Sequence, residues 1–188
     1  MAITIAGSGI TSANIADGTI TNADINSSAA IDGSKVDGSF GKVLQVVSVS
    51  KVDAFTTTSS SFVDITGLTV TITPTSTTSK ILVQYNTITG NGTAGWTTWV
   101  QLVRDTTNLS QSTIASAGRN GSSYSIDGSV SGAVGTSLTY LDSPATTAAI
   151  IYKLQLSSEG ASTGTVNRRG DGTADGGSSS ITVMEIGA

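Results

Sequence analysis

The sequence predicts an all-β fold, and three observations support this prediction. Val, Ile and Thr alternate with polar residues over short runs, and Leu68, Val70 and Ile72 show the period of two that is typical of strands. Clusters of Gly, Asn, Ser and Asp separate the runs and favour turns. From residue 42 onward no stretch sustains a period of 3.6 residues, so no helix is expected there.

The expected strands start at Lys42. They are residues 42–50, 61–74, 79–88, 96–104, 129–141, 149–157 and 179–186, with residues 105–108 forming a turn. About eight strands in roughly 145 residues indicate an antiparallel β-sandwich, jelly-roll-like, over residues 41–188. The last run ends almost at Ala188, so we expect the C-terminus to be tied into a sheet.

Residues 1–40 follow a different pattern, in which apolar residues recur about every five positions between small polar spacers. This series consists of Ile5, Ile10, Ile15, Ile20, Ile25, Ile31 and Val36. A spacing of five fits neither one face of a helix nor one face of a strand. Asp-Gly pairs at 17–18, 32–33 and 37–38 favour turns. We therefore expect an extended, repeatedly turning N-terminal segment.

So few apolar side chains cannot offset the backbone entropy lost when forty residues become ordered. A partner surface is therefore expected to cover the isoleucines. Identical chains around a three-fold axis would do so, as would a docking surface on another protein. A single-chain solenoid capped by the following domain is the alternative. We predict that residues 1–40 are an attachment and trimerisation segment of a homotrimer.

The amino-acid composition argues against most kinds of catalytic, metal-binding and nucleic-acid-binding site. The chain has no Cys and no His, which removes thiol nucleophiles, zinc sites of the Cys/His type and the commonest general base. Nine basic residues are scattered and the net charge is -4, so nucleic-acid binding is not expected. No run of about 20 apolar residues is present to enter a membrane. We expect no enzyme activity, no cofactor and no metal.

Four residues are candidates for contacting a receptor: Trp96, Tyr124, Arg168 and Arg169. Aromatic residues make up only 5% of the chain, and such rings stack on sugars or anchor protein partners. The two arginines lie in the Gly-rich stretch "RRGDGTADGG". For the aromatic residues, packing in the core or at the trimer interface is favoured over receptor contact. Asp171 and Asp175 could share a hard cation, but a solvated loop is favoured.

Several stretches resemble one family. "ADGTITNADINSSAAIDGSKV" resembles a connecting segment found in tail-fibre and structural proteins of marine tailed bacteriophages. "GKVLQVVSVSKVDAFTTTSSSFVDITGLTVTITPTSTTSKILV" resembles the start of the fibre-head domain that follows it. "YLDSPATTAAIIYKLQ" and "SSSITVMEIGA" resemble the last strands of that domain. The middle of the chain, from about Gly90 to Val134, matches only loosely.

The resemblance implies a virion protein, made in the bacterial cytoplasm and placed on the virion surface. A trimeric β-rich head would contact a host glycan or protein, and the N-terminus would hold to tail or capsid proteins. A capsid decoration or vertex (head-fibre) protein without a receptor is the alternative. A polysaccharide-degrading tailspike is a third reading, although the chain has only two glutamates and its aspartates sit mostly in turn sequences.

Replacing Ile15 and Ile20 together with Asp should abolish assembly and attachment while the head stays folded. Burying unpaired carboxylates costs several kcal/mol each, whereas the strands of residues 41–188 form their own core. Light scattering and decoration of purified particles measure the two effects. A double variant that still forms trimers and decorates particles would contradict the prediction.

Overall fold

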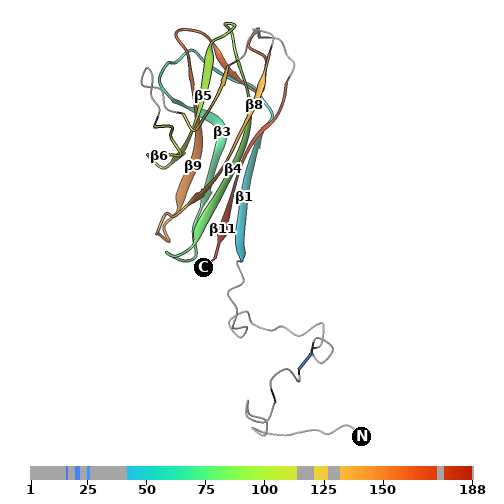
Figure 1. Ribbon diagram of the computed structural model, residues 1–188, viewed down its shortest axis with the longest axis vertical. Coiled ribbons are helices and arrows are strands. Elements are labelled where there is room, and N and C mark those ends of the chain that lie inside the picture. The colour runs from blue at the N-terminus through green and yellow to red at the C-terminus, as the bar shows by residue number, and fades with distance from the viewer. Residues whose placement is uncertain are drawn as a thin grey trace. The chain divides into compact units, whose positions relative to one another are not determined.

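The computed structural model describes residues 16, 20, 21, 25, 42–113, 121–126, 132–172 and 176–187 (Figure 1). The chain divides into two units, Met1–Ser39 and Phe40–Ala188. In the first unit Ile20 and Ile25 are described, and 56% and 39% of their respective surfaces are exposed. The remaining members of the five-residue series, Ile5, Ile10, Ile15, Ile31 and Val36, lie outside the described residues.

The described part of the second unit contains eleven strands and no helix, and the all-β prediction is confirmed. All strand pairs are antiparallel. The strands are β1 Val43–Lys51, β2 Phe55–Thr57, β3 Val63–Ile72, β4 Lys80–Asn91, β5 Thr97–Arg104, β6 Thr107–Leu109, β7 Ser123–Ile126, β8 Val134–Asp142, β9 Ile150–Ser158, β10 Gly164–Val166 and β11 Ser179–Ile186.

The seven expected runs correspond to β1, β3, β4, β5, β8, β9 and β11. Sequence reasoning missed the four short strands, because runs of three or four mostly polar residues give at most a weak alternation. One local expectation was partly wrong. Asp105 and Thr106 form the expected turn, but Thr107 and Asn108 belong to β6. Pairing with β5 decides the conformation of these two residues.

The strands form two sheets that face each other (Figure 1). Sheet A has the order β1-β11-β4-β8, and the short strands β10 and β2 extend it beside the last residues of β4. Sheet B has the order β3-β9-β5, with β6 and β7 pairing with β5. One apolar core lies between the sheets, and its fully buried members include Leu68, Ile81, Leu102, Leu154 and Ile181.

The two ends of this two-sheet unit differ. At one end, here called the entry end, the chain enters at Lys42 and leaves at Gly187, and the Gly187 N–H donates to the Lys42 carbonyl at 2.8 Å. The connections that follow β4, β9 and β10 lie at the opposite end, here called the loop end (Figure 1). The expected tie of the C-terminus into a sheet is confirmed, since β11 lies between β1 and β4.

A buried carboxylate closes the core at the entry end. Glu185 points inward from β11, and its side chain is fully buried. One oxygen accepts from Gln45 Nε2 at 2.6 Å, and the other accepts from the N–H and the hydroxyl of Thr75, each at 2.7 Å. These bonds tie β11 to β1 and to the connection between β3 and β4.

Burial alone raises the pKa of Glu185, but the hydrogen bonds from Gln45 and Thr75 outweigh burial and lower its pKa from 4.5 to about 2. The folded state therefore binds a proton at this carboxyl less readily than the unfolded state does. The stability that Glu185 contributes is fully present above about pH 4.5, and it is lost as the pH falls from 4.5 towards 2.

We expect Glu185→Gln to lower the free energy of unfolding by about 1–3 kcal/mol at pH 7, because the amide turns a donor towards Gln45 or Thr75. The difference from the unmodified chain should shrink below pH 4.5. Urea unfolding at pH 7 and pH 3 measures both effects. Glu159→Gln, at the only other glutamate of the chain, is the matched control and should lower the free energy of unfolding by less. A difference in unfolding free energy between Glu185→Gln and the unmodified chain that is as large at pH 3 as at pH 7 would contradict the lowered pKa of Glu185.

Candidate functional site

The loop end is built on a buried polar network around Asn91, the last residue of β4. Asn91 Nδ2 donates to Thr98 Oγ1 at 3.2 Å and to Ser158 Oγ at 3.1 Å, which joins β4 to β5 and β9 of the opposite sheet. Its Oδ1 accepts from the Thr93 N–H at 3.0 Å and from the Ser162 hydroxyl at 2.6 Å. A single amide therefore fixes two loops on the frame of the two sheets.

Trp96 lies in the connection between β4 and β5, and 37% of its surface is exposed. Its ring packs against Gly160, where an added Cβ would overlap the ring atoms. Gly160 also has a φ of +56°, a conformation that favours glycine. Next to it, the Glu159 carboxylate accepts from the Thr97 N–H at 2.8 Å. The ring is thus held against Gly160 and remains partly exposed to solvent.

Arg168 and Arg169 lie in the connection between β10 and β11. Gly170 approaches the Asn91 backbone so closely that a Cβ at this position would overlap the Asn91 carbonyl. Thr165 Oγ1 donates to the Arg168 carbonyl at 2.7 Å, and Arg169 Nη2 forms an ion pair with Asp171 at 2.9 Å. The loop is therefore seated on the end of β4. Asp175 lies outside the described residues, so the cation pair with Asp171 remains untested.

Tyr124 lies on a different surface. It pairs with Trp99 across β7 and β5, and both side chains project from the outer face of sheet B. Tyr124 and its neighbour Ile126 are 62% and 55% exposed, respectively. Ile126 pairs with Thr97, which directly follows Trp96 in the chain, so this apolar strip reaches the loop end.

The structure therefore brings three of the four predicted residues to one end. Trp96, Arg168 and Arg169 lie on loops attached to the last residues of β4, while Tyr124 lies on the adjoining sheet face. Sequence reasoning missed Ile126 as an exposed apolar residue, because the short strand β7 was not expected. The Ser-Tyr-Ser-Ile alternation was the available signal.

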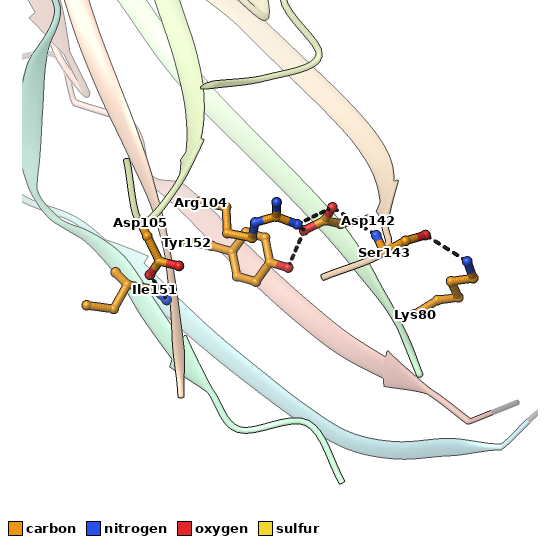
Figure 2. Close-up of polar contacts among 7 residues, drawn as sticks. All are labelled: Lys80, Arg104, Asp105, Asp142, Ser143, Ile151 and Tyr152. Carbon is orange, nitrogen blue, oxygen red and sulfur yellow. Dashed lines mark hydrogen bonds and ion pairs between the residues drawn. The ribbon is translucent and has the colours of Figure 1, made fainter. Parts of the chain in front are cut away.

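Asp142 is the other buried carboxylate at the entry end (Figure 2). Both of its oxygens accept from Arg104 Nη1 at 2.8 Å, and Oδ2 also accepts from the Tyr152 hydroxyl at 2.6 Å. The Ser143 N–H donates to Oδ1 at 2.8 Å. Asp142 belongs to sheet A, whereas Arg104 and Tyr152 belong to sheet B, so these hydrogen bonds link the two sheets. Burial and the bond to Asp142 raise the pKa of Tyr152 far above its usual range.

Asp142 and Glu185 flank the same residue, since Ile81 pairs with each of them. Two inward carboxylates on one row are the arrangement that a glycosidase would require, but a general acid needs a raised pKa. The pKa of Glu185 is lowered instead, so Glu185 is poorly suited to the role of general acid. Both carboxylates accept hydrogen bonds from other strands and thereby stabilise the fold.

Among the described residues, no three His, Cys, Asp or Glu side chains gather as a metal site. No helix in the same part of the chain is long and apolar enough to cross a membrane. A scan against protein-family models finds no match to this chain, and a search of curated proteins finds none either.

Gly160→Ala should displace the Trp96 ring and raise its accessibility to a quencher, because the new methyl group overlaps the ring. The backbone strain at positive φ adds about 1 kcal/mol of destabilisation. Acrylamide quenching of Trp96 in a Trp99→Phe background measures the displacement. Gly95→Ala is the matched control, since it has a φ of +76° but open space around its Cβ. Equal quenching in both variants would contradict the packing of Trp96 on Gly160.

Proposed function

We propose that this chain is a fibre protein on the surface of a tailed bacteriophage, attached by its N-terminus and meeting the host with a trimeric head. The observation that carries the proposal is that the head has two different ends. The segment predicted to attach to the particle joins the head at Lys42, at the entry end, whereas Trp96, Arg168 and Arg169 lie at the loop end. A fibre head requires this separation of anchor and contact surface.

The strand orders support a jelly-roll head. Eight of the eleven strands lie four to a sheet, in the orders β1-β11-β4-β8 and β3-β9-β5-β7. The chain crosses between sheets A and B after β2, β3, β4, β7, β8 and β9, as the paired Greek keys of a jelly roll require. Jelly rolls are common in virion and lectin domains. The fold sets the frame, while the function rests on the loops.

The loop end is suited to binding. Two of its loops, residues 92–96 and 159–163, are short and are held by Asn91, so little entropy is lost when a ligand is bound there. Trp96 offers an aromatic face, and the two arginines offer planar donors for hydroxyl or carboxylate groups. Three copies around an axis would raise avidity by about 10²–10⁴ without strong single sites.

Purified full-length trimer should compete with phage for adsorption to host cells. The combined variant Trp96→Ala, Arg168→Ala and Arg169→Ala should compete at least tenfold less well, since it removes the aromatic face and both cations. Lys153→Ala, on the outer face of sheet B away from the loop end, is the control and should compete as the unmodified chain does. A saturating trimer that leaves adsorption unchanged would overturn receptor binding in favour of capsid decoration. Loss of a host polysaccharide over time would indicate a tailspike instead.

A further inference from the structure

The outer face of sheet A is unusually uniform. It presents the outward side chains of four long strands, arranged in transverse rows by the antiparallel register. One row consists of Ser50, Ser180, Asn86 and Ser137, and the next towards the entry end consists of Ser48, Thr182, Gln84 and Thr139. The row after that, towards the entry end, is Val46, Met184, Leu82 and Leu141, which is called the apolar row here.

The apolar row crosses the whole sheet. Its end members, Val46 on β1 and Leu141 on β8, are each 56% exposed, while Met184 and Leu82 between them are half-buried. Val43, also 56% exposed, pairs with Ile186 and extends the apolar surface beyond the row. A contiguous apolar strip of this kind on a solvent-facing sheet marks an interaction surface.

The face carries almost no charge. Its three rows contain no acidic or basic side chain, and the neighbouring Lys80 donates from Nζ to Ser143 Oγ at 2.7 Å. The hydroxyl rows pair laterally, with Ser48 and Thr182 at 2.8 Å. By contrast, the outer face of sheet B carries the Lys153–Asp64 ion pair. A charged partner would gain nothing on sheet A, whereas a copy of the same neutral face meets no like charge there.

Both edges of the face are unprotected. Within the described residues β1 pairs only with β11, and β8 pairs only with β4. Monomeric proteins usually guard edge strands with charged residues or Pro. Neither appears in β1 before Lys51 or in β8 before Asp142, and both of these side chains are buried. Such edges are typical of strands that another copy of the chain covers.

We propose that copies of this chain pack together through the outer face of sheet A, with the β1 side of one copy against the β8 side of the next. Because the apolar row runs from one edge strand to the other, each copy offers one end of the row to each neighbour, and the contacts close into a ring. The face measures roughly 20 Å by 30 Å, or about 600 Å², from strand spacing and rise. The ring divides this area between two neighbours, so each contact is smaller than the roughly 800 Å² per partner of a standard interface. This inference deepens the proposed trimeric head.

Light scattering of the full-length chain tests the interface. The unmodified protein should have three times the chain mass of 18.8 kDa, and Leu141→Glu should have the mass of one folded chain. Ile126→Glu is the matched control, because Ile126 is also an apolar residue on a β-strand, and 55% of its surface is exposed. It should remain assembled. Circular dichroism of each variant establishes that it is folded, and Val46→Glu at the other edge serves if Leu141→Glu does not fold.

Cysteine crosslinking tests the arrangement independently, since the chain contains no cysteine. A chain carrying both Val46→Cys and Leu141→Cys, treated with a short bismaleimide, should give a ladder that stops at three chains. Within one chain these positions are about 14 Å apart across three strand spacings, beyond the reach of a direct disulfide. Ile126→Cys with Ile151→Cys, on the outer face of sheet B, should give no ladder.

A monomeric unmodified chain would overturn the inference, as would a Leu141→Glu variant that stays assembled. A monomer in which Leu141→Cys resists labelling would point to the N-terminal segment of the same chain as the covering group. The host-adsorption assay is separate, because it depends on the loop end. A trimer that Leu141→Glu dissociates but that never competes for adsorption would keep this interface and refute only the receptor-binding role.

Discussion

The closure of a two-sheet core at its ends is the constraint on which the rest of this structure depends. Alternation fills the middle of the sandwich with apolar side chains, but apolar packing stops at the inward positions of the last rows. At the entry end these positions are Glu185 and Asp142, each held by donors from another strand or from the opposite sheet. The link of Asp142 with Arg104 and Tyr152 fixes the spacing of the two sheets where apolar packing ends.

At the loop end the core is closed by uncharged polar side chains. Thr89 and Ser125 form a buried hydroxyl pair at 2.7 Å, and Asn91 satisfies both its amide and its carbonyl within the network. An uncharged, fully bonded network holds the loops without the desolvation cost of a buried ion. The buried base of the loops is therefore held by uncharged groups, and the charged side chains of this end lie in the loops themselves. That combination suits repeated weak contacts better than acid–base chemistry.

The low content of charged residues also bears on how copies of the chain assemble. Charged residues are only 12% of the chain, against about 25% in typical soluble domains. Most described charges are engaged in ion pairs or hydrogen bonds, as with Lys51 and Asp53 at 2.7 Å and Arg169 and Asp171 at 2.9 Å. The outer face of sheet A is left to hydroxyl, amide and apolar groups. A surface of this kind avoids repulsion between identical copies, and its apolar row gains from being covered.

The sequence by itself determined the β-class and the long strands, because a period of two at Leu68, Val70 and Ile72 admits one conformation. It also singled out Trp96 and the arginine pair, because aromatic residues and clustered arginines are scarce in this chain. Only the tertiary structure decided what these residues share. The pairing of β4 with β10 and the contact of Gly170 with Asn91 join loops about seventy residues apart, and no local pattern encodes that register. The apolar row arises in the same way, because its four members come from four strands and are neighbours only when the sheet is formed.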